Sequence, residues 1–236
     1  MNSFLIKRII PFFLAIIAIE FFAFSILLIA NQEHVDWSFL SMIKTIGILL
    51  KTTSFAFLYV IMPYVFYLLL IPIKYINTKI DKILTQTTFA LFVFFNLFEE
   101  SMSLVFWEKH LSSFNQEAVQ YLINIPEQIN EISRDYLFIT FIVALLIITF
   151  LIVRCYGKYL FTPMPQLQWH KRFIYIFLYI LCCCLVFVNF NEDELRIEEN
   201  TYNNEISKDG TYSLALSVWK NNLSQKDFSL FKQKNK

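Results

Sequence analysis

The sequence predicts an all-α polytopic membrane protein. Of its 236 residues, 57% are hydrophobic, with 27 Phe and only 3 Gly. Several uncharged stretches continue for about 18 residues, long enough for a helix to cross the hydrocarbon core of a bilayer. The apolar residues form continuous runs rather than an alternating pattern, which disfavours a transmembrane β-barrel. We therefore expect five transmembrane helices, with an extracytoplasmic interfacial helical segment between spans 3 and 4.

The first span is predicted from Ile9 to Ala30. Lys7 and Arg8 precede it, as they would in a signal peptide. The run is longer than a usual signal-peptide core and no small-x-small cleavage site follows, so we interpret it as a retained helix. Glu20 is an intramembrane charge near its middle. Such a group faces the bundle interior or a water-filled cavity. Glu20 either has a functional role or is a protonated, uncharged carboxyl group that hydrogen-bonds to a neighbouring helix.

Two further spans are predicted in the first hundred residues. Phe39–Leu50 is expected to be an interfacial lead-in to the second span, which runs from about Thr52 to Pro72. Pro63 lies inside this span and is expected to kink it. The third span is predicted from about Ile83 to Phe98, with the Glu99–Glu100 pair terminating it.

The stretch from Phe106 to Tyr136 has helical periodicity but is too polar to span a bilayer. Pro126 is expected to divide it into two short helices, at about 106–135, that lie on the outer membrane surface. Asn115 either contacts a lipid head group or simply caps the helix that follows it. The candidates for lipid contact in this segment are Trp107, Asn115, Tyr121 and Glu127.

The fourth and fifth spans are predicted at Tyr136–Val153 and Phe173–Phe190. The second and fourth connections contain three and four Lys or Arg residues, whereas the first and third contain two each, interspersed with acidic residues, and the short N-terminus contains two. By the positive-inside rule, the second and fourth connections are cytoplasmic. Five spans then place the N-terminus inside and the C-terminus outside.

Two stretches carry a resemblance to a known family. The first has the order Phe114-Asn115-x-x-Ala118-Val119-x-Tyr121-Leu122, followed by Glu127-x-Ile129-x-x-Ile132. The second reads Asn204-Glu205-Ile206-Ser207-Lys208-Asp209-Gly210-x-Tyr212-Ser213. Together they resemble the extracytoplasmic loop and the linker of the lipoteichoic-acid-synthase-like phosphotransferases, which are membrane-anchored relatives of the sulfatases and alkaline phosphatases.

The resemblance implies a division of the chain. Residues 1–190 would be a five-span transmembrane domain and residues 191–236 an extracytoplasmic linker tail, with the catalytic sulfatase-like domain absent. Family members transfer phosphoglycerol or phosphoethanolamine from phospholipid head groups, with a divalent metal such as Mn or Mg in the catalytic domain. The resemblance also implies a bacterial cytoplasmic membrane and a phospholipid partner. The chain would be a truncated or split gene product with a separately encoded catalytic domain, a fragment, or a stand-alone membrane module. We expect no nucleic-acid partner, and no catalytic residue, cofactor or metal site in this chain.

Two other functions are compatible with the residues. One is a non-enzymatic lipid-binding or regulatory membrane protein. The other is a transporter that uses Glu20, which the lack of an evident internal repeat disfavours. The four cysteines and three histidines do not have the spacing of metal ligands, and the cysteines are interpreted as apolar packing residues.

Overall fold

In the computed structural model, the described residues are 3–115, 118–119, 136–161, 163, 168–188 and 200–218, and their regular elements are all helices. Among these described residues, five helices are long and apolar enough to cross a membrane. They are α1 (Ser3–Ala30), α2 (Phe39–Val60), α4 (Lys79–His110), α6 (Tyr136–Leu160) and α7 (Trp169–Val188). The predicted all-α polytopic fold is confirmed.

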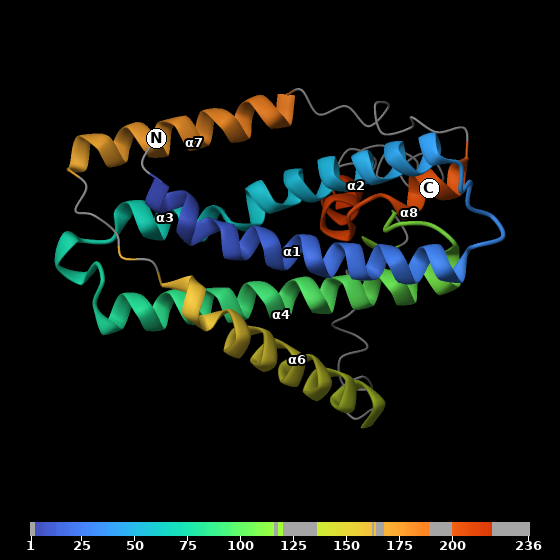
Figure 1. Cartoon of the computed structure of the whole chain (residues 1–236), viewed down its shortest axis with the longest axis horizontal. Helices are drawn as coiled ribbons and strands as arrows, with labels where there is room; N and C mark the ends of the chain where they lie inside the picture. Colours follow the sequence, from blue (N-terminus) through green and yellow to red (C-terminus); the bar gives the residue numbers. More distant parts are fainter. Residues whose placement is uncertain are drawn as a thin grey trace, which may run out of the picture.

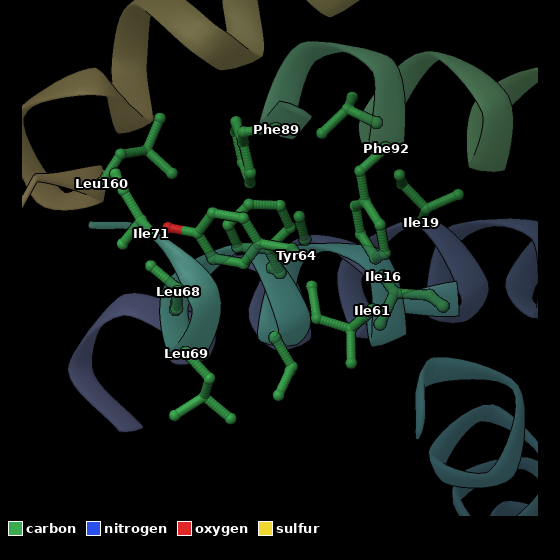
Figure 2. Packing of buried hydrophobic residues seen from close by; sticks show 14 of the residues in the cluster. Ile16, Ile19, Ile61, Tyr64, Leu68, Leu69, Ile71, Phe89, Phe92 and Leu160 are labelled. Atoms are coloured by element: carbon green, nitrogen blue, oxygen red, sulfur yellow. The ribbon is translucent and has the colours of Figure 1, made fainter. Parts of the chain in front are cut away.

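Helix α1 lies in the middle of the bundle (Figure 1), with α2 and α4 on either side. Helix α6 packs against α4, whereas α7 packs against α2 and α3 (Met62–Leu70). The main core lies where α1, α3 and α4 meet (Figure 2). There Phe12 stacks on Tyr64 with 4.5 Å between ring centroids, and Phe89 meets Phe12 edge-on at 5.0 Å.

The expected interfacial lead-in at Phe39–Leu50 is wrong, because these residues are the first half of α2, which continues unbroken to Val60. Their hydroxyl groups do not require water: Thr45 donates a hydrogen bond to the Ser41 carbonyl, 2.8 Å away, on the preceding turn of its own helix. The disruption expected at Pro63 is present, since α2 ends at Val60 and Pro63 lies in the first turn of α3.

The third span is longer than predicted. Helix α4 continues from Lys79 past Glu99 and Glu100 to His110. The acidic pair was expected to end the span because charged side chains are costly in an apolar environment. Instead, both carboxyl groups turn toward polar groups of a distant segment, so the helix does not need to end where they occur.

The connections fall at two opposite ends of the bundle. At one end, Arg8 of α1 forms an ion pair with Asp81 of α4, 2.9 Å between Nη2 and Oδ2. At that end too, Arg172 of α7 donates hydrogen bonds to the backbone carbonyls of Leu69 and Ile71. The first connection and the C-terminal end of α4 gather at the other end, around residues 200–218.

Residues 200–218 are inserted into the bundle beside α1 and α2 (Figure 1). They comprise α8 (Thr201–Ile206) and a further helical stretch at 210–218, and we call them the C-terminal segment. Asn200 caps α8 by accepting hydrogen bonds from the N–H groups of residues 202 and 203. Ile206 packs in an apolar cluster with Phe24, Leu49 and Trp107. The linker motif by itself does not predict this insertion.

Asn203 and Glu205 are two of the residues that anchor the C-terminal segment through polar contacts. Asn203 is fully buried: its Oδ1 accepts from the Asp36 N–H at 2.9 Å, and its Nδ2 lies 3.1 Å from each of Asp36 O, Ser41 Oγ and Thr45 Oγ1. Ser113, just beyond α4, donates to Glu205 at 2.6 Å. Although burial opposes ionisation of Glu205, the adjacent Lys208 ammonium and the Ser113 hydrogen bond hold the pKa of this carboxyl below its ordinary value.

Candidate functional site

Four carboxyl groups from three separate parts of the chain meet inside the bundle. Glu20 comes from α1, Glu99 and Glu100 from α4, and Asp209 from the C-terminal segment; we call them the carboxylate cluster. One carboxylate oxygen from each of the three glutamates lies within 4.8 Å of the other two. Glu20 is only 3% exposed and Asp209 is fully buried.

The C-terminal segment completes this cluster through its turn at residues 207–211. The Asp209 N–H donates to Thr52 Oγ1 of α2 at 3.2 Å, and Asp209 Oδ1 accepts from the Tyr212 N–H at 2.7 Å. Thr211 Oγ1 donates to Glu99 Oε2 at 3.1 Å. The segment is therefore bonded to both α2 and α4 at the cluster.

Gly210 allows the backbone to approach the two α4 glutamates closely. A Cβ at this position would lie 2.2 Å from Glu99 Oε1 and 3.0 Å from Glu100 Oε1. The first distance is shorter than any normal non-bonded contact, so a larger residue would displace Glu99. Because residue 210 is a glycine, the carboxyl groups of Glu99 and Glu100 lie directly against its backbone.

The cluster has more acceptor oxygens than hydrogen-bond donors. One oxygen of each of the four carboxyl groups is buried without a hydrogen-bond partner. None of the four forms an ion pair with a basic side chain among the residues that the structure describes. Burial also raises the pKa of Asp209 above its ordinary value, since the charged form loses its hydration.

A cavity of about 580 Å³ lies next to the cluster, along one side of α4. Glu99 and Asn96 form part of its wall, as does Thr211, so the cavity and the cluster share residues. Its remaining walls are mostly apolar, and Lys109 and His110 line it near the end of α4. Phe95 and Val105 are 60% and 48% exposed, so the cavity lies at the surface of the helix bundle.

The structure places the predicted site residues in different environments. Glu20 faces the bundle interior, as expected. Trp107 is 5% exposed and packs in the apolar core with Ile206, and its contact with lipid stays a prediction. Asn115 is half-buried, and its Nδ2 donates to Ser112 Oγ at 3.3 Å. Tyr121 and Glu127 lie outside the described residues, as do most of the predicted interfacial helices.

Sequence reasoning missed the partners of Glu20. In the sequence, Glu99 and Glu100 resemble the end of a span, and Asp209 resembles part of a linker motif. Two adjacent acids inside an apolar run were the available signal, because such acids are costly unless they share a polar site. Which other carboxylates they would meet depends on how distant segments pack.

No protein-family model, curated protein or solved structure matches this chain.

Proposed function

We propose that the chain is the membrane domain of a lipoteichoic-acid-synthase-like phosphotransferase, and that it binds an anionic phospholipid in the cavity along α4. The proposal includes a bacterial cytoplasmic membrane, with the N-terminus in the cytoplasm. In this role the chain presents its lipid on the outer side of the membrane to a catalytic domain that carries the metal-dependent chemistry.

The cavity is the observation that carries lipid binding. Its α4 wall extends from Phe95 to His110, which is about 22 Å at the rise of an α-helix. This length suits an acyl chain, and the apolar lining supplies the favourable burial that a chain requires. Lys109 and His110, in the last turn of α4, provide donors where a lipid phosphate would lie.

A second observation supports the family assignment. The first residue of the loop stretch and the linker stretch lie at the same end of the bundle. Ser217, four residues after the linker stretch, donates a hydrogen bond to the Phe114 carbonyl at 3.0 Å, and Ser113, one residue before the loop stretch, donates to Glu205. This proximity is compatible with a shared role in lipid presentation.

The lipid site is tested by native mass spectrometry of the purified chain with phosphatidylglycerol. Met102 lines the cavity, so Met102→Trp should fill it and lower phosphatidylglycerol retention by about tenfold or more. Lys109→Gln should weaken retention of phosphatidylglycerol more than that of a neutral diacylglycerol, because it removes only the charged contact.

Two matched controls lie on the same helix. Leu91 is 52% exposed and outside the cavity, so Leu91→Trp should leave retention unchanged. Lys82 is exposed at the other end of α4, and Lys82→Gln should also have no effect. Equal loss in Leu91→Trp and Met102→Trp would mean that lipid associates with the whole apolar surface, and the proposed site would be rejected.

A further inference from the structure

The carboxylate cluster requires a positive partner. Carboxylates that are removed from water and carry no counter-charge are strongly destabilising, so they take up protons or bind a cation. The C-terminal segment brings the fourth carboxylate, Asp209, to three glutamates that already converge within 4.8 Å. Protons can bridge carboxyl groups in pairs, whereas one cation can bind several oxygens at once.

Neighbouring oxygens other than carboxylates favour the cation. Thr53 is 1% exposed and lies beside Asp209, so its hydroxyl oxygen belongs to the same polar pocket. Asn96 lies one turn before Glu99 and Glu100 on α4 and is 3% exposed; its Nδ2 donates to the Phe92 carbonyl at 2.7 Å, which leaves its buried Oδ1 without a partner among the described residues. A buried, unpartnered amide oxygen and a hydroxyl oxygen beside several carboxylates are a ligand set for a metal ion.

The chemistry of the ligands identifies the class of ion. The set contains carboxylate, hydroxyl and amide oxygens, with no sulfur or imidazole among the described neighbours. Oxygen-only sites suit hard divalent cations such as Mg²⁺, Ca²⁺ and Mn²⁺.

We propose that Glu20, Glu99, Glu100 and Asp209 bind a hard divalent cation that fastens the C-terminal segment into the helix bundle. Glu20 and the α4 pair belong to the membrane helices, whereas Asp209 belongs to the inserted segment. The cation therefore cross-links parts of the chain that are far apart in sequence. This site goes beyond the proposed lipid site and uses different charged groups.

Mn²⁺ serves as the probe, because its free-ion signal in electron paramagnetic resonance falls as it binds. The purified full chain, stripped of metal and free of phospholipid, is titrated in detergent. We expect saturable binding that both Mg²⁺ and Ca²⁺ displace. Glu20→Gln and Asp209→Asn preserve shape but remove a charge, and each should weaken Mn²⁺ binding by about tenfold or more.

Three further variants make the result specific. Glu108 is exposed on the same helix as Glu99, so Glu108→Gln should bind Mn²⁺ like the parent. Gly210→Ala keeps every carboxylate but pushes Glu99 aside, and should also weaken binding. Lys109→Gln should lose lipid and retain Mn²⁺, which separates failure of this site from failure of the lipid site.

Hydrogen–deuterium exchange gives a second readout, which reports whether bound Mn²⁺ stabilises the C-terminal segment. Added Mn²⁺ should slow exchange in residues 200–218 of the parent, and Glu20→Gln should abolish that slowing. Size-exclusion chromatography confirms that each variant is folded. Absence of saturable Mn²⁺ binding by the parent would overturn the proposal. Unchanged binding in both Glu20→Gln and Asp209→Asn would overturn it too.

Discussion

Buried ionisable side chains occur in two different environments in this molecule. Arg8 and Asp81 are 0% and 1% exposed, and they neutralise each other through two hydrogen bonds of 3.0 and 2.9 Å. Tyr67 adds a third bond to Asp81 at 2.8 Å. The carboxylate cluster contains no such basic partner among the described residues. The Arg8–Asp81 pair is therefore a neutralised structural ion pair, and the carboxylate cluster is a different kind of buried site.

Replacing Arg8 by Met should be strongly destabilising, because Asp81 would remain as an uncompensated buried charge. We expect a loss of about 3–5 kcal/mol, typical of a buried pair that loses one partner. Thermal unfolding in detergent measures it. The double variant Arg8→Met/Asp81→Leu should recover much of the loss, and if it is no more stable than Arg8→Met, the ion pair is not the cause.

At the scale of elements, the C-terminal segment determines the shape of the site. It contributes Asp209 and Thr211 to the cluster and Ile206 to the core, and it contacts α1, α2 and α4. Asn203 is the main polar anchor, since its amide contacts both the Asp36 backbone and two hydroxyls of α2. Loss of this anchor would leave several buried polar groups without partners.

Asn203→Ala should loosen the C-terminal segment without unfolding the five long helices. The unpaired polar groups are expected to cost about 1–3 kcal/mol. Faster hydrogen–deuterium exchange in residues 200–218 reports the change, and Thr201→Ala, an exposed position in the same helix, is the control. Equal exchange in the parent and in Asn203→Ala would show that apolar packing alone holds the segment.

For the whole molecule, the arrangement of the connections is consistent with the predicted topology. The first connection, the end of α4 and the C-terminal segment contact one another at one end of the bundle. Five membrane crossings place these three parts on the same side. Which side of the membrane these parts occupy is predicted only from the distribution of Lys and Arg.

Reporter fusions test the orientation directly. Fusions after Lys79 and Lys158 should report a cytoplasmic location, and those after Lys109 and Lys220 an extracytoplasmic one, because high Lys and Arg counts mark the cytoplasmic connections. A cytoplasmic signal after Lys220 would contradict both the five-span topology and the proposed outer location of the cluster.

The sequence by itself determined the helical membrane class and the number of spans, because length and continuous hydropathy depend only on local composition. It also identified Glu20 as unusual, since one acid in a long apolar run is costly wherever it lies. Only the tertiary structure decided what Glu20 meets. Glu99 and Glu100 looked like the end of a helix, and Asp209 looked like part of a linker, until the C-terminal segment was inserted beside them. Contacts between residues so far apart follow from packing, and the periodicity of the separate segments does not encode them.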